Sequence, residues 1–178
     1  MRQSPSAAAD PAAALKCGLA VEVLRSFGEL RFVEAGWSML PTVWPGDTLV
    51  FERIGQDQVH VGDVVLVGRD GRLCTHRVIS KPEASGPTCC ITQGDAMPAP
   101  DRPVMENELL GRVAYLIRAG KLIALPPELS TVQSLLAQVV RRSFPAARAL
   151  VFLRRMIHAS DKSAPESAPR ESVFPCQG

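Results

Sequence analysis

Short runs of β-branched and apolar residues, separated by turn-forming pairs, occupy the middle of this chain. Such runs are typical of strands, and the Gly-Asp, Asp-Gly and Ala-Gly pairs between them are typical of tight turns. Asp70-Gly71 is the clearest hairpin signal, because this dipeptide tolerates the positive φ angles of a two-residue turn. The pattern predicts strands at Leu30–Glu34, Thr48–Glu52, Val64–Val67, Leu73–Ile79, Thr88–Gln93, Leu110–Ile117 and Lys121–Leu125.

Helix-compatible segments flank this β-rich part. Leu15–Phe27 contains no proline and carries apolar residues throughout, which predicts a short helix. Ser130–Ile157 alternates apolar residues with arginines and predicts two helical stretches split near Pro145. We therefore expect a mainly β fold with flanking helices: a flexible N-terminus (1–14), a short helix (15–29), a β domain (30–125), a basic amphipathic helical extension (126–158) and a disordered tail (159–178).

The length of the chain suits one domain with extensions, and its net charge is small. Its 178 residues are 46% hydrophobic, which is ample for a core, and the formal net charge is only +2. This balance neither indicates nor excludes a nucleic-acid partner, and we expect none. The segment Arg118–His158 is nevertheless basic, with Lys121 and six arginines against the single acid Glu128. Residues 130–158 form the amphipathic part of this segment and suit a peripheral membrane contact, packing on the domain itself or contact with a partner protein, and the sequence leaves these open.

Membrane-spanning and secretory segments are not predicted. No segment offers roughly 18 uninterrupted apolar residues, the length that a spanning helix needs. Met1–Ala14 also lacks the apolar core of a secretory signal peptide. We expect a cytoplasmic or peripheral membrane protein.

The five cysteines say little about disulfides or the redox compartment. Their number is odd and Cys89 and Cys90 are adjacent, so no disulfide framework can be read and a reduced compartment is mildly favoured. Cys74 and His76 alternate onto one strand face and could form a metal cluster with Cys89 or Cys90. This spacing resembles no common zinc site, and free thiols are the favoured interpretation. We predict no metal and no cofactor.

One short loop offers a candidate nucleophile. The stretch Gly36–Asp47 contains Ser38, and Pro41, Pro45 and Gly46 restrict or redirect its backbone, which favours an ordered connection into the following strand over a long helix. A serine hydroxyl needs a base and a group that orients the base before it can act as a nucleophile.

Only three histidines could serve as that base. His60 alternates with two valines and is expected to face solvent, and His158 lies in an arginine-rich segment where a cation at a helix end is the simplest interpretation. His76 lies in a β-branched run, and a strand ending in Gly94-Asp95 follows, with Asp101 shortly after. A hydrogen-bonded structural histidine is the ordinary alternative, but the residue order serine, histidine, aspartate favours a catalytic unit.

These motifs together resemble the successive boxes of type I signal peptidases. The resemblance spans roughly Val33–Ile123 and is carried by Gly-x-Ser-Met-x-Pro-Thr, Pro-Gly-Asp, Val-Gly-Asp-Val-Val, His-Arg-Val and Gly-Asp with a trailing aspartate. The bacterial and mitochondrial enzymes of that family have lysine before the arginine, whereas the archaeal and endoplasmic-reticulum branch has histidine. Because His76 precedes Arg77, the chain is similar to the Ser/His branch. The resemblance implies a coiled β-sheet domain and a serine endopeptidase that acts on leader or signal-like peptides in extended conformation.

The resemblance also implies roles for individual residues. Ser38 would be the nucleophile and His76 the general base, with Asp101 orienting the histidine and Asp95 as the alternative to Asp101. Asp47 and Asp63 repeat the Gly-Asp pattern and are expected to form turns. The backbone amide of Ser38 would stabilise the oxyanion, and the substrate-groove candidates are Gly36, Trp37, Met39 and Pro41.

Two features of the loop depart from the family. Gly36 stands where signal peptidases often have serine, so it offers no side-chain oxyanion donor, and Trp37 adds bulk where they usually have glycine. At both positions the chain is similar to the self-cleaving LexA-like proteases, which share the fold of signal peptidases but use a lysine base. The alternatives to a peptidase acting on other chains are therefore a LexA-like regulator that cuts itself, with Cys17-Gly18 and Ala35-Gly36 as candidate bonds, and a catalytically silent peptide-binding domain.

Overall fold

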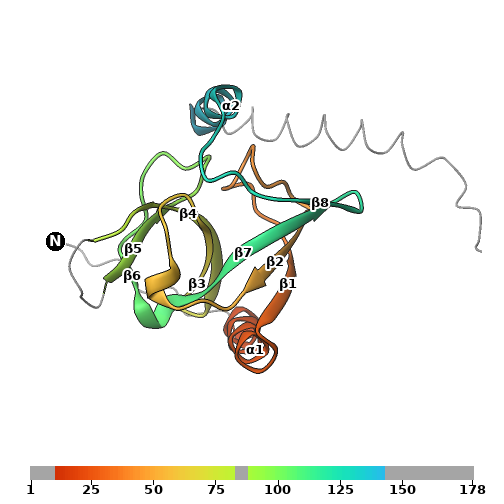
Figure 1. Cartoon of the computed structure of the whole chain (residues 1–178), viewed down its shortest axis with the longest axis vertical. Helices are drawn as coiled ribbons and strands as arrows, with labels where there is room; N and C mark the ends of the chain where they lie inside the picture. The colour runs from red at the N-terminus through yellow and green to blue at the C-terminus, as the bar shows by residue number, and fades with distance from the viewer. Residues whose placement is uncertain (1–10, 83–87, 143–178) are drawn as a thin grey trace, which may run out of the picture.

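Eight antiparallel strands form the body of the protein, as seen in a computed structural model that describes residues 11–82 and 88–142. The sheet order is β1-β2-β7-β3-β4-β5-β6, and β8 pairs with the end of β7 (Figure 1). The sheet is not closed into a barrel. The strands are β1 (Glu29–Val33), β2 (Thr48–Glu52), β3 (Val64–Arg69), β4 (Arg72–Ser80), β5 (Thr88–Gln93), β6 (Val104–Met105), β7 (Leu109–Arg118) and β8 (Lys121–Ile123).

The sheet coils because its ladders contain irregularities. Register shifts interrupt the β2–β7 pairing between Val50 and Phe51 and the β3–β7 pairing between Leu66 and Val67. Irregularities of this kind bend a strand and increase its twist. The ten-residue strand β7 lies between β2 and β3 and pairs with β2 mainly through its second half and with β3 through its first half.

Two tight hairpins have the backbone conformation that their sequences predict. Asp70 and Gly71, between β3 and β4, have φ angles of 52° and 70°. Ala119 and Gly120, between β7 and β8, repeat the arrangement with 50° and 75°. Positive φ at two consecutive residues matches the right-handed twist of the flanking strands.

Two helices flank the strands, as the hydrophobic pattern predicts. The helix α1 (Pro11–Phe27) contacts β1, β4 and β7 and buries Ala20 and Leu24, and α2 (Thr131–Arg142) lies at the other end of the molecule in the view of Figure 1. Residues 11–14 belong to α1, so their assignment to a flexible N-terminus is wrong. Proline is well suited to the first turn of a helix and alanine has high helix propensity, which explains the earlier start.

Two apolar clusters occupy opposite faces of the coiled sheet. The first contains Leu24 of α1, Phe51 of β2 and Leu66 of β3, and the second contains Val65 and Val78 with the buried thiols of β5. Side chains alternate between the faces of a strand, so β4 contributes to both clusters. This alternation also sends the side chains of consecutive residues of β4 to opposite sides of the sheet.

The predicted mainly β fold with flanking helices is confirmed, and the strands Thr48–Glu52 and Thr88–Gln93 have the predicted bounds. The two-residue strand β6 and the short helices η1 (Gln56–Gln58) and η2 (Glu106–Glu108) were not predicted, since each is too short to show a period. The predicted tail, the helical stretch after Pro145 and the first ten residues lie outside the described residues. Within the described part of the chain, every helix is too short or too polar to cross a membrane.

Candidate active site

A closed loop presents Ser38. The amide of Glu34 donates to the carbonyl of Asp47 at 2.9 Å, and the amide of Gly46 donates to the carbonyl of Glu34 at 2.7 Å, so the loop ends are held together. The carboxylate of Asp47 accepts from the Trp44 amide at 2.7 Å and from the Arg118 guanidinium. Asp47 therefore forms a turn, as expected, and also ties the loop to β7.

Asp63 has the same arrangement at a second Gly-Asp pair. Its side chain accepts from the amide of His60 at 2.8 Å, and its own amide donates to the carbonyl of His60 at 3.1 Å. His60 itself is exposed, as expected, and Nδ1 of its ring lies 3.8 Å from the Asp63 carboxylate. His158 lies outside the described residues.

Ser38 and His76 are in hydrogen-bonding contact. The Ser38 Oγ lies 3.2 Å from Nε2 of His76, which projects from β4 and is only 6% exposed. Nδ1 of the same ring lies 2.5 Å from Oδ2 of Asp101. The ring thus has the hydroxyl on one nitrogen and the carboxylate on the other, which is the arrangement of a serine nucleophile with an oriented base.

Asp101 is held in place independently of the histidine. Its Oδ2 accepts from the hydroxyl of Thr92 at 2.7 Å, and its amide donates to the carbonyl of Thr92 at 2.8 Å. Thr92 lies on β5, which pairs with β4 beside His76. Sequence reasoning did not identify Thr92, because a threonine in a strand carries no signal of its own.

The surroundings of His76 favour the protonated ring. Burial lowers the pKa of His76, but the hydrogen bonds and charges of Asp101 and Cys74 outweigh burial and raise the pKa to about 10. Burial raises the pKa of Asp101, whereas hydrogen bonds from His76 and Thr92 and nearby positive charge prevail and lower it. Asp101 is therefore a carboxylate that stabilises positive charge on the ring.

Asp95 does not contact His76 and has a different environment. Both of its carboxylate oxygens pair with Arg77, at 2.9 and 3.0 Å, and one also accepts from the hydroxyl of Thr42 at 2.5 Å. Arg77 is on the opposite face of β4 from His76, and it also donates to the carbonyl of Gly62 at 2.9 Å. The alternative assignment of Asp95 as the orienting acid is thus not supported by the geometry, which gives it a buried structural ion pair.

The turn at Asp95 fixes the serine loop directly. The amide of Ala96 donates to the carbonyl of Ser38 at 2.8 Å. At the preceding glycine the two segments are in close contact: a Cβ on Gly94 would lie 2.7 Å from the Ser38 carbonyl oxygen and 3.0 Å from Nε2 of His76. Only glycine fits there without moving the serine loop or the imidazole.

The amides near Ser38 differ in their availability as oxyanion donors. Within the described residues, the backbone amide of Ser38 has no hydrogen-bond acceptor. The amide of Gly36 donates to the Glu34 carboxylate at 2.7 Å, so it is already engaged. An oxyanion could be bound by the Ser38 amide, whereas Gly36 would first have to release Glu34.

The structure corrects two of the four groove candidates. Met39 is 1% exposed and belongs to the apolar cluster that contains Leu24, and Pro41 is buried, so neither side chain faces a bound substrate. They were predicted from their place beside Ser38, but the turn directs them inward. Trp37 is 38% exposed, and Gly36 is partly exposed, so both remain candidates.

Cys74 lies against the ring of His76. Its Sγ is 3.4 Å from both ring nitrogens of His76, as the alternation along β4 predicts. Cys89 and Cys90 are buried, and burial raises the pKa of the Cys90 thiol to about 12. In residues 11–82 and 88–142, no three histidine, cysteine or acidic side chains are grouped so that they could hold a metal ion.

The helix α2 packs on the far side of this site. Val140 of α2 forms a small buried cluster with Leu40 of the serine loop and Ala96. Nε of Arg141 donates to the carbonyl oxygen of Asp95 at 3.0 Å. At least this part of the basic extension therefore packs on the domain, in contact with the turn that holds Ser38.

No protein-family model matches the chain, and no curated protein matches it significantly. The case for any function therefore depends on the geometry of the residues themselves.

We predict that Asp95→Ala lowers the free energy of unfolding by about 3–5 kcal/mol, because it leaves the buried guanidinium of Arg77 without its counter-charge. Urea unfolding monitored by circular dichroism measures this loss. The matched control Asp57→Ala removes an exposed carboxylate and should change stability by less than about 0.5 kcal/mol. Equal stability of the two variants would contradict the structural role of Asp95.

We also predict that Arg141→Ala accelerates hydrogen exchange at the Ala96 amide by about fivefold, since loss of one hydrogen bond costs about 1 kcal/mol and loosens the turn. Exchange of this amide can be followed by NMR. The control Val139→Ala changes the exposed face of α2 and should leave the Ala96 exchange rate unchanged. An unchanged rate in Arg141→Ala would mean that α2 does not restrain the turn.

Proposed function

We propose that the protein is a serine endopeptidase that uses Ser38 as nucleophile and His76 as general base. The observation that carries the proposal is the continuous contact from the Ser38 hydroxyl through the His76 ring to the Asp101 carboxylate. The resemblance to Ser/His signal peptidases, with its ordered boxes, supports the same assignment.

The mechanism follows from these contacts. Nε2 of His76 takes the proton of Ser38 as the hydroxyl oxygen attacks a peptide carbonyl, and the ring then gives that proton to the departing amine. An acyl group remains on Ser38 until water, activated by the same ring, hydrolyses the ester. Asp101 keeps a proton on Nδ1 and stabilises the imidazolium that forms in each half of the reaction.

The tetrahedral intermediate needs hydrogen-bond donors at its oxyanion. The free backbone amide of Ser38 supplies one donor. The Gly36 amide becomes a second donor if the Glu34 carboxylate leaves it when substrate binds. Such donors contribute a large share of the rate of acyl transfer.

The substrate in this proposal is a peptide in extended conformation. The resemblance favours a leader or signal-like peptide with small side chains near the cleaved bond. Trp37 is exposed beside Ser38, and its indole provides an apolar surface for the chain that enters the site. Backbone hydrogen bonds to an exposed strand edge would supply affinity without demanding a particular sequence.

We expect Ser38→Ala and His76→Ala each to reduce kcat by about 10⁴-fold or more, and the double variant to lose little beyond either single change, because the residues act as a unit. The measurement is cleavage of candidate leader peptides followed by mass spectrometry. The control His60→Ala changes an exposed histidine outside the site and should retain full activity.

The same samples test self-cleavage. A native chain whose intact mass falls on incubation, while the Ser38→Ala chain stays whole, would indicate a LexA-like reaction on the chain itself. Peptide cleavage that persists in Ser38→Ala would end the proposal. Binding without any turnover in the native protein would favour a silent peptide-binding domain.

The activity should depend on pH through His76. The ring acts as a base only when it is neutral, so kcat/KM should rise about tenfold per pH unit below a pKa of about 10, and the acidic limb should lie well above the ordinary value of 6.5. In Asp101→Asn the carboxylate charge is lost, so this limb should shift to lower pH while the maximal rate falls by about 10³–10⁴-fold. A pH–rate profile of both proteins measures the shift. An unshifted limb would mean that Asp101 does not control the base.

A further inference from the structure

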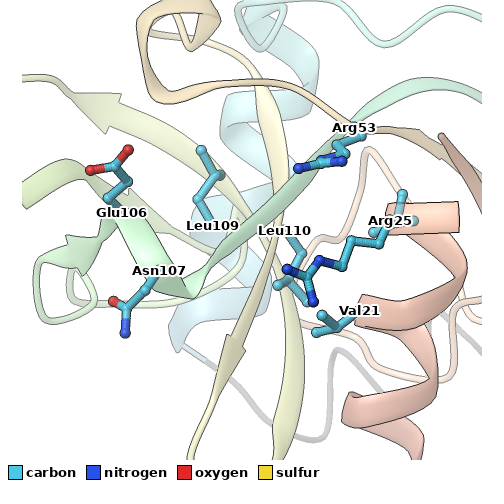
Figure 2. Close-up of a pocket in the computed structure, with 8 residues that line it drawn as sticks. Val21, Arg25, Arg53, Glu106, Asn107, Leu109 and Leu110 are labelled. Atoms are coloured by element: carbon cyan, nitrogen blue, oxygen red, sulfur yellow. The ribbon is translucent and has the colours of Figure 1, made fainter.

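A pocket lies at the α1 end of the molecule and shares no residue with the serine site. Its volume is about 310 Å³, and α1, β7 and the short helix η2 contribute most of its lining (Figure 2). The strand β3 lies between β7 and the strand that carries His76. Neither the proposed mechanism nor the resemblance to signal peptidases uses this pocket.

The floor of the pocket is apolar and one wall is positively charged. Val21 of α1 and Leu109 and Leu110 of β7 form this floor, whereas Leu24 of α1 is only 1% exposed and belongs to the core. Arg25 and Arg53 extend along the same side of the pocket (Figure 2). A ligand of matching chemistry would carry an apolar group beside an anionic group.

Arg25 and Arg53 are exposed, and like Arg72 they have no ion pair within the described residues. Arg69, Arg112 and Arg118 each pair with a carboxylate. In the part of the chain that the structure describes, the side chains of Arg25 and Arg53 have no hydrogen bond and no ion pair. An anion in the pocket could accept hydrogen bonds from these unpaired guanidinium groups.

The opposite wall has hydrogen-bonding capacity of another kind. Glu106 and Asn107 of η2 line it, and both side chains are exposed. Glu106 accepts hydrogen bonds and Asn107 donates and accepts them, which suits the amide groups of a peptide. The volume is at the lower end of the range for ligand pockets, so the ligand must be small or only a short segment of it can enter.

We propose that this pocket binds a short peptide segment in which a carboxylate lies next to an apolar side chain. The carboxylate contacts Arg25 and Arg53, the apolar side chain covers the leucines of the floor, and the backbone amides face Glu106 and Asn107. The carboxylate can belong to an acidic side chain or to a chain end. This binding does not depend on the serine chemistry.

The test is fluorescence polarisation with labelled pentapeptides and the full-length Ser38→Ala protein, which prevents cleavage. The peptides end in Leu-Glu with an amidated C-terminus, in Leu-Gln with an amidated C-terminus, and in Leu-Gln with a free C-terminus. We expect the first or third peptide to bind up to about tenfold more tightly than the second, which lacks a carboxylate, and to weaken as salt is raised. The peptide that binds identifies the source of the carboxylate.

The protein variants assign the binding to this pocket. Adding Arg25→Gln and Arg53→Gln together should remove the preference for a carboxylate, whereas the control Arg72→Gln, an exposed arginine on β4, should retain it. Thermal unfolding verifies that each variant is folded. The proposal is overturned if none of the peptides binds at millimolar concentration, if all three bind equally, or if the double variant keeps the preference. Cleavage by the native protein is a separate readout, so either proposal can fail alone.

Discussion

The buried ion pair between Arg77 and Asp95 is the interaction on which the arrangement of the site depends. Arg77 follows His76 on β4, so the two side chains lie on opposite faces of one strand. The ion pair fixes the turn after β5 to β4, and the next amide in that turn, of Ala96, donates to the carbonyl of Ser38. Ser38 and His76 are therefore held in alignment by a charge pair on the opposite face of β4.

Much of the fold could be predicted because its strands are separated by residues with a strong conformational preference. The Asp70-Gly71 hairpin is an example, since its positive φ angles are a local property of the two residues. The start of α1 at Pro11 was missed, because an alanine-rich segment has little amphipathic pattern although it favours helix. The pairing of Val104–Met105 with β5 is a long-range contact of a two-residue segment, and it leaves no periodic signal.

The residues of the candidate site, but not all of their contacts, could also be predicted from the sequence. Ser38, His76 and Asp101 were identified from ordered boxes, and the structure brings them into contact although 38 and 25 residues separate them in the chain. Spacing alone left Asp95 as an alternative to Asp101, since it does not show which carboxylate shares a face with the imidazole. The contact of Arg141 with the Asp95 carbonyl was unpredictable, because it depends on where a helix docks.

Gly94, between β5 and the Asp95 turn, is a position at which the site tolerates no side chain. At Gly94 the backbone passes so close to the Ser38 carbonyl and to His76 that any side chain would have to displace the serine loop or the imidazole. The strand pairing of the sheet does not depend on Gly94, because β4 and β5 pair through other residues. A chain with the same architecture but a larger residue there would keep the paired strands and lose the contact between the Ser38 hydroxyl and the His76 ring.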